Sequence, residues 1–146
     1  MKGFNVIEHQ FPAQHIREYP QATANTQEDA LTISAKQYIP LDNPNPQSGD
    51  VTLIAAHANA FPKEIYEPLW EDLTSRIKTA GWRIRSIWAA DVAHQGQSSI
   101  LNEHLLGNEP AWQDHSRDLL QMINLKRDEM PRPIIGIGHS MGGNQL

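Results

Sequence analysis

The chain has 146 residues, a formal net charge of −5 and no cysteine. Without cysteine it can form neither a disulfide framework nor a thiolate metal site. Acidic and basic residues are interspersed, so no basic stripe is available to neutralise the phosphates of a nucleic acid. No apolar run approaches the roughly 18 residues of a membrane-spanning helix, and the N-terminus lacks the apolar core of a signal peptide. We therefore expect a soluble, intracellular protein with no nucleic-acid partner, transmembrane segment, cofactor or metal.

The first 50 residues are predicted to form strands joined by loops. Residues 4–11 are weakly strand-like, and residues 12–29 are polar and contain Pro20, which is typical of a loop. Residues 31–39 alternate between apolar and polar side chains, as a half-exposed strand does. Three prolines, two asparagines and a glycine in residues 40–50 predict a connecting loop.

The pattern changes at residue 51. Val51–Ala56 is a short, continuous apolar run, as expected for a strand buried on both faces of a parallel sheet. Glu67 and Pro68 open a predicted helix, in which apolar residues recur at helical spacing until Gly81 stops it. The apolar residues of this helix are Leu69, Trp70, Leu73, Ile77 and Ala80. Residues 82–89 form a second predicted strand.

A second helix is predicted over residues 110–127, with Asn108 as its N-cap and an apolar stripe along one side. The stripe consists of Trp112, Leu119, Leu120 and Ile123. Ile134–Gly138 follows as a third buried strand. The order β-α-β-α-β predicts a parallel sheet with helices on both faces and right-handed crossovers. The four tryptophans are expected to lie mostly in the core.

The run from Gly138 to Gly142 carries the features of a serine nucleophile. A serine needs an exposed position, a general base and donors for the oxyanion. A sharp strand-to-helix turn would expose Ser140 and crowd the backbone two residues to either side, where glycine is favoured. Gly138 and Gly142 occupy those positions, and Gly143 adds further room. The backbone N–H of Met141 would face the negative charge that develops on a substrate.

Two further loops follow predicted strands and should open on the same edge of the sheet. The first begins at His57 and contains small residues, which would let backbone N–H groups approach a substrate oxygen. The second covers residues 91–98, and its Asp91 is expected to cap the loop.

With these three loops in this order, the sequence resembles the α/β-hydrolase superfamily over roughly residues 31–146. The run around Ser140 resembles the nucleophile elbow, and residues 57–59 resemble the loop whose third residue supplies an oxyanion-hole N–H. Residues 91–98 resemble the loop after the fourth strand of the family. Within the superfamily, the sequence is similar to a fungal group of peroxisomal lipase and toxin-biosynthesis hydrolases. It departs from the family at Ala58, where glycine is usual, and at Gln95, where glycine is frequent.

The resemblance implies an α/β fold, namely the N-terminal portion of an α/β-hydrolase fold that is incomplete at its C-terminus. Residues 1–146 would be a single partial domain with a mostly parallel sheet flanked by helices. Residues 1–50 would supply N-terminal antiparallel strands and loops, and residues 51–146 the β-α-β-α-β unit up to the elbow. The implied activity is that of a serine esterase or lipase on a small-molecule ester or lipid-like substrate, in the cytoplasm or peroxisome. The catalytic acid and histidine would lie downstream of this chain.

The resemblance also assigns roles to residues. Ser140 would be the nucleophile, and Met141 and Asn59 would donate the oxyanion N–H groups. The expected substrate-binding residues are His57, Ala58, Ala60, Phe61 and His139. Neither of these two histidines is expected to be the base, because His57 should hydrogen-bond its own loop and His139 should point away from the serine. His94 is expected at the surface or a pocket rim. The remaining histidines lack metal-ligand spacing and are expected to be solvated; they are His9, His15, His104 and His115.

Two other interpretations remain open from the sequence. Gly136, Gly138 and Gly142 form G-x-G-x-x-x-G after a strand, which is a variant of a dinucleotide-binding loop. Alternatively, the chain is an inactive fragment or a non-catalytic relative that only binds, and an open sheet edge would then make the isolated chain poorly soluble. The oligomeric state and the choice between ester hydrolysis, thioester hydrolysis and acyl transfer are left open.

Overall fold

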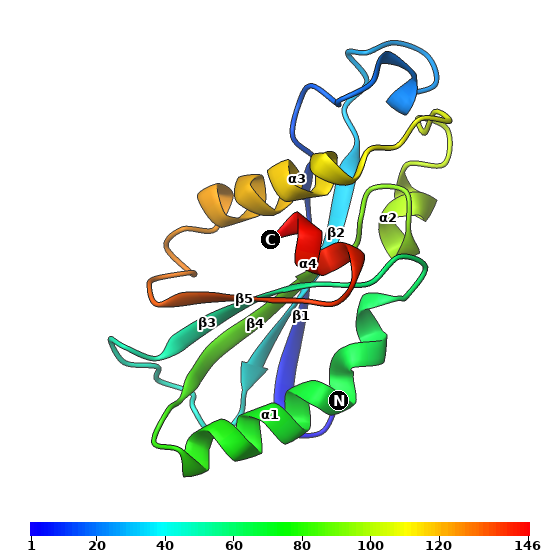
Figure 1. The fold of residues 1–146 in the computed structure, drawn as a ribbon. Helices are drawn as coiled ribbons and strands as arrows, with labels where there is room; N and C mark the ends of the chain where they lie inside the picture. Colours follow the sequence, from blue (N-terminus) through cyan, green and yellow to red (C-terminus); the bar gives the residue numbers. More distant parts are fainter.

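The computed structural model describes residues 1–146 and contains one five-stranded mixed sheet in the order β1-β2-β4-β3-β5 (Figure 1). The strands are β1 (Phe4–Pro12), β2 (Thr32–Pro40), β3 (Val51–Ala56), β4 (Ile84–Ala90) and β5 (Ile134–Gly138). β1 pairs with β2, and β2 with β4, in antiparallel fashion, whereas β3 pairs in parallel with both β4 and β5. The expected parallel unit with antiparallel strands before it is therefore confirmed.

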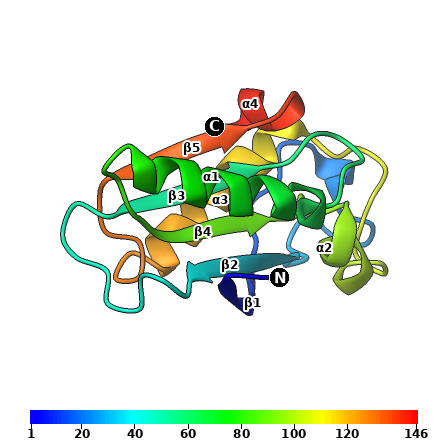
Figure 2. The same cartoon turned by 90° about the horizontal axis from the view of Figure 1, so that it is seen from below.

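Helices cover both faces of this sheet. The α-helices are α1 (Glu67–Thr79), α2 (Gly96–Leu101), α3 (Trp112–Leu125) and α4 (Met141–Gln145). Two 3-10 helices, η1 (Pro20–Ala22) and η2 (Lys63–Tyr66), precede β2 and α1. Figures 1 and 2 show α1 on one face and α3 on the other, and α4 contacts both α3 and β3. No helix is long and apolar enough to cross a membrane.

The strand β3, which lies between β4 and β5, contributes to both cores because its side chains alternate between the two faces. Leu53 and Ala55 belong to the core under α1, where Trp70 is 1% exposed. Ile54 and Ala56 belong to the core under α3, which also contains Trp88. Every residue of β3 is buried, as the continuous apolar run predicted. The first turn of α1 contains Pro68, and Gly81 follows the helix with a φ of +84°, so both predicted ends of this helix are confirmed.

Several expectations about burial are wrong. β2 is mostly buried because side chains on both of its faces pack in a core, Ile33 and Ala35 under α3 and Tyr38 under α1, whereas its alternating pattern predicted a half-exposed strand. β5 was expected to be buried, but it lies at the edge of the sheet and Ile135 is 44% exposed. Trp82 is exposed because β4 begins only at Ile84, after the turn. Leu69 on α1 is also exposed.

The expectations for the second helix also need correction. α3 begins after Ala111, so Asn108 is not its N-cap. Trp112 and Leu120, expected on the apolar stripe, are exposed. The reason is that the buried face of α3 contains charged residues, which the loop before β2 covers. Both Asp114 and Asp118 are almost completely buried there.

Arg17 from that loop explains how two carboxylates can be buried on α3. Its guanidinium donates two hydrogen bonds to Asp118, at 2.7 and 3.0 Å, and its Nε lies 3.4 Å from Asp114. Burial raises the pKa of Asp118, and the ion pair with Arg17 opposes that shift. The polar segment predicted as a free loop is thus held against α3 by charge-assisted hydrogen bonds.

Candidate active site

The turn between β5 and α4 has the geometry expected of a nucleophile elbow. Ser140 is exposed and adopts φ 53° and ψ −113°, a conformation that residues with a side chain rarely adopt. A Cβ at position 142 would overlap the carbonyl oxygen of Ala56, and a Cβ at position 138 would lie 2.5 Å from the carbonyl oxygen of Gly142. Glycine is therefore required at both predicted positions. Gly143 is different, because a Cβ there would meet nothing closer than 3.8 Å.

The loop after β3 approaches the elbow, and its conformation is set largely by His57. The backbone N–H of Val92 donates to Nε2 of His57, so the ring proton is on Nδ1, which donates to the carbonyl of Ala58 at 2.8 Å. Both ring nitrogens are used, and the side chain is buried. This confirms the expectation that His57 hydrogen-bonds its own loop.

The far end of the same loop is held by Gln95. Its side-chain oxygen accepts the N–H of Ala60, and its side-chain nitrogen donates to the side-chain oxygen of Asn59, each at 2.8 Å. Ala60 has a positive φ of 62°. Glycine, which is frequent at position 95 in the family, could not form these bonds. The side chain of Gln95 therefore has a structural role, because it holds the loop after β3 in place.

Several backbone N–H groups of the site, including those of Ser140 and His57, have no hydrogen-bond acceptor within the chain, and two of the others matter most. They belong to Asn59 and Met141, the two residues expected to hold the oxyanion. Of the groups next to them, the N–H of Ala58 donates to Tyr66 and that of Gly142 donates to the carbonyl of His139. Free donors at these two positions are what an anion-binding site needs.

The loop after β4 is organised by Asp91. Its carboxylate accepts the N–H of Gln97 at the start of α2, so the predicted loop-capping role is confirmed. It also forms a buried ion pair with Lys63, at 2.5 Å, with side-chain exposures of 1% and 3% respectively. Gly96 has a φ of +56°, and a Cβ there would overlap the Asp91 carboxylate. The ion pair joins the loop after β4 to η2.

The other histidines do not supply a base for Ser140, whose side chain takes part in no hydrogen bond. His115, expected to be solvated, is completely buried on α3, and burial together with His57 and Arg17 lowers its pKa to about 3. His94 is half-buried, as a rim residue would be, and burial lowers its pKa. His9 was also expected to be solvated, but its ring lies against Trp88, with centroids 4.7 Å apart.

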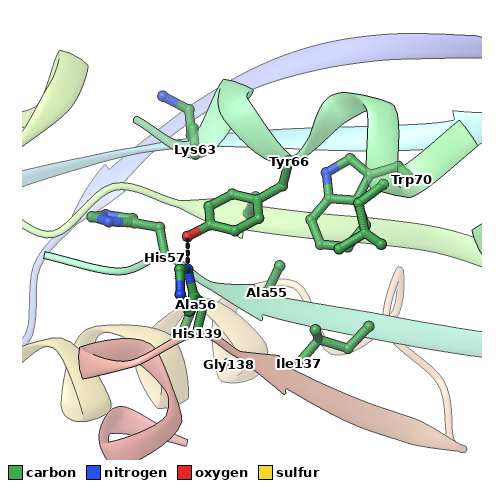
Figure 3. A pocket seen from close by; sticks show the side chains of 11 residues that line it. Ala55, Ala56, His57, Lys63, Tyr66, Trp70, Ile137, Gly138 and His139 are labelled. Carbon is green, nitrogen blue, oxygen red and sulfur yellow. Dashed lines mark hydrogen bonds between the residues drawn. The ribbon is translucent and has the colours of Figure 1, made fainter. Parts of the chain in front are cut away.

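A cavity of about 220 Å³ lies between α1 and the sheet, beside the site (Figure 3). Its apolar wall includes Ala55, Trp70 and Ile137, and its polar end includes His57, Lys63, Tyr66 and His139. Of the five expected substrate-binding residues, only His57 and His139 line this cavity. Ala58 is buried under the loop, whereas Ala60 and Phe61 are exposed. Phe61 lies edge-on to His139, with ring centroids 5.7 Å apart.

Two residues with a structural role in the site, Lys63 and Tyr66, were not predicted from the sequence. The hydrogen bonds of Gln95 to Asn59 and Ala60 were not predicted either. Lys63 and Tyr66 lie between a predicted loop and a predicted helix, where nothing in the spacing marks them. The only signal was that a lysine and a tyrosine closely follow the loop after the first buried strand. Lys63 pairs with Asp91, 28 residues away in the chain, and Tyr66 bonds to His139, 73 residues away.

The dinucleotide-loop interpretation has no support in this geometry. The glycine run follows the fifth strand, at the sheet edge, whereas the fingerprint normally follows the first strand of its fold. Gly138 and Gly142 are required by packing within the turn and against β3.

The sheet order and the flanking helices are those of the α/β-hydrolase fold. The solved peroxisomal alpha-beta-hydrolase Lpx1 from Saccharomyces cerevisiae matches with a TM-score of 0.84 and 25% identity, over 99% of this chain and 40% of that one. A putative hydrolase from Agrobacterium vitis S4 matches in fold with a TM-score of 0.61 and 16% identity, over 97% of this chain and 43% of that one.

Sequence comparison gives more specific relatives. The type I acyl-CoA thioesterase mpaH' of Penicillium brevicompactum is 53% identical over 142 residues, which are 97% of this chain and 32% of the relative. The thioesterase mpaH of Penicillium roqueforti is 51% identical over 141 residues, with the same coverage. No family model matches the chain. The chain thus has the fold of the solved α/β-hydrolase Lpx1 and spans about a third of the length of the fungal relatives.

Proposed function

We propose that Ser140 is the nucleophile of a serine hydrolase that cleaves acyl esters, with acyl thioesters as the preferred substrate class. The observation that carries the proposal is the strained, exposed backbone of Ser140 between two obligatory glycines, next to two unsatisfied N–H groups. Strain of this kind costs of order 1–3 kcal/mol and is kept where it serves a function. The thioester preference rests on the relatives named as acyl-CoA thioesterases.

In the proposed reaction, Ser140 Oγ bonds to the carbonyl carbon of the substrate and its proton passes to a base. The carbonyl oxygen becomes an oxyanion that accepts hydrogen bonds from the N–H groups of Met141 and Asn59. Collapse of this intermediate breaks the bond to sulfur or oxygen, and the leaving group departs as a protonated thiol or alcohol. Water then hydrolyses the acyl-serine and releases the carboxylic acid.

The base and the acid that orients it are proposed to come from sequence outside this chain. The histidines nearest the elbow form other hydrogen bonds. Both ring nitrogens of His57 are hydrogen-bonded, to the carbonyl of Ala58 and to the N–H of Val92. His139 is hydrogen-bonded to Tyr66. A peroxisomal location is proposed in preference to a cytoplasmic one, because the yeast relative is named as peroxisomal.

The test is Ser140→Ala in the full-length protein, assayed for hydrolysis of acyl-CoA and of a simple carboxylic ester. Activity is expected to fall by about a thousandfold or more, because the nucleophile is removed while the fold is kept. Ser75→Ala is the matched control, since Ser75 is exposed on α1, away from the elbow. A fluorophosphonate should label wild type and Ser75→Ala but not Ser140→Ala.

Undiminished activity in Ser140→Ala would refute the proposal. A folded wild-type protein that hydrolyses neither substrate and is not labelled would instead favour the non-catalytic interpretation.

A further inference from the structure

The side chain of Tyr66 contacts two of the three loops of the site, namely the loop after β3 and the elbow. It is the last residue of η2 and directly precedes α1. Its half-buried ring is tilted against Trp70, with centroids 6.1 Å apart, and lies edge-on to His139 at 6.0 Å. The ring is therefore held by α1 while the hydroxyl projects toward the loops (Figure 3).

The hydroxyl of Tyr66 forms one hydrogen bond to each of these loops. The backbone N–H of Ala58 donates to it at 3.0 Å, and it lies 2.9 Å from Nδ1 of His139. A backbone N–H can only donate, so the tyrosine oxygen accepts from Ala58, and its one proton is free to be donated to Nδ1 of His139. In this arrangement Nδ1 of His139 accepts the bond and the ring proton is on Nε2.

These bonds act on the donor expected to hold the oxyanion. The peptide group is planar, so the carbonyl of Ala58 and the N–H of Asn59 belong to one rigid unit. His57 holds that carbonyl, and Tyr66 holds the N–H of the peptide group before it. Two consecutive peptide planes are thus fixed, and together they set the direction of the free N–H of Asn59.

The second bond acts on the elbow. His139 directly precedes Ser140, and its backbone N–H donates to the carbonyl of Ala56 at 3.1 Å. Through the side chain of His139, Tyr66 adds a second connection between the end of β5 and the loop after β3. The spacing between the N–H groups of Asn59 and Met141 depends on how these two segments sit relative to each other.

We propose that Tyr66 is a positioning residue, whose hydroxyl sets the separation of the two oxyanion donors by joining the loop after β3 to the elbow. The proposal rests on the proposed function of Ser140. Tyr66 touches neither the nucleophile nor the scissile bond and acts through Ala58 and His139. Since the oxyanion forms only in the transition state, loosening its donors lowers kcat and leaves KM nearly unchanged.

The experiment compares Tyr66→Phe with Tyr38→Phe in the full-length protein, using acyl-CoA as substrate. Each variant removes one tyrosine hydroxyl next to the start of α1, but that of Tyr38 donates to Glu67, at 3.1 Å, and reaches no loop of the site. We expect kcat of Tyr66→Phe to fall about tenfold or more, with KM within about twofold, because one misplaced oxyanion donor costs up to 10²–10³ in rate. Tyr38→Phe should retain kcat within about twofold.

His139→Leu removes the same hydrogen bond from its other end, so its kcat tests the inference if Tyr66→Phe is poorly folded. Where both variants fold, a double-mutant cycle joins them. Because the two side chains share one hydrogen bond, their effects on kcat should be less than additive. Additive effects, or a Tyr66→Phe variant with the kcat of Tyr38→Phe, would overturn the positioning role. Ser140→Ala, measured alongside, separates the two proposals: loss of activity there with normal Tyr66→Phe activity refutes only the role of Tyr66.

Discussion

We predict that His115 makes the stability of this protein sensitive to acid. Its side chain is completely buried on α3, and neither ring nitrogen has a hydrogen-bond partner in the chain. The groups facing it are cationic or can become so: the ring of His57 lies 6.1 Å away, and Arg17 and His94 also oppose its protonation. Burial is the largest cause and the charges add to it, so the pKa of His115 falls to about 3.

The magnitude follows from the difference between the folded and unfolded pKa values. The unfolded chain binds a proton at this residue below about pH 6.5, whereas the folded chain binds it only near pH 3. The contribution of His115 to stability is therefore complete above about pH 6.5 and is lost as the pH falls toward 3. At pH 5.0 the gap of about 1.5 pH units corresponds to a loss of about 2 kcal/mol.

The assay is urea unfolding of the full-length protein at pH 7.5 and pH 5.0, for wild type and His115→Leu. The variant has no titrating group at this site, so its free energy of unfolding should change by about 2 kcal/mol less between the two pH values. Asp118, whose raised pKa acts in the opposite direction, is present in both proteins and cancels in the comparison. His104→Leu, at an exposed position, should behave like wild type. An equal pH dependence in wild type and His115→Leu would refute the reasoning.

Two further predictions concern the glycines of the elbow and the buried ion pair. Gly142→Ala should abolish hydrolysis and destabilise the protein by about 3 kcal/mol, because its Cβ overlaps the Ala56 carbonyl. Gly143→Ala should be tolerated, because a Cβ at that position has room. Thermal unfolding and thioester turnover of both variants check this prediction, and equal tolerance of the two substitutions would contradict it. Asp91→Asn should cost about 3 kcal/mol, because it leaves the Lys63 ammonium buried beside a neutral amide. Adding Lys63→Met should restore part of that loss in urea unfolding, and a further loss would argue against the pair.

The elements whose formation depends on neighbouring residues could be predicted from the sequence. The continuous apolar run of β3, the start of α1 at Glu67 and Pro68, and the glycine after that helix are local features, and the structure confirms them. The need for glycine at positions 138 and 142 was also predictable, because the crowding arises within a short turn packed on the strand beside it.

Burial was predicted less well where the partner is far away in the chain. The alternating pattern of β2 indicated a half-exposed strand, yet its two faces pack in the two cores, under α3 and under α1. The apolar stripe predicted for α3 included Trp112 and Leu120, which are exposed, because nothing near the helix in sequence reveals that Arg17 pairs with Asp118, 101 residues away. His115 was misjudged for the same reason, since it lies on the buried face of the same helix.

The strands of the parallel unit, the helices between them and the turn at Ser140 could be predicted because they follow from spacing and backbone sterics over a few residues. The side chains that support the turn are fixed only by tertiary packing. Tyr66 and His139 meet only because α1 packs on the sheet beside β5, and Lys63 reaches Asp91 only because β3 and β4 are neighbours. Such contacts depend on how the elements pack together, and no local pattern of residues encodes them.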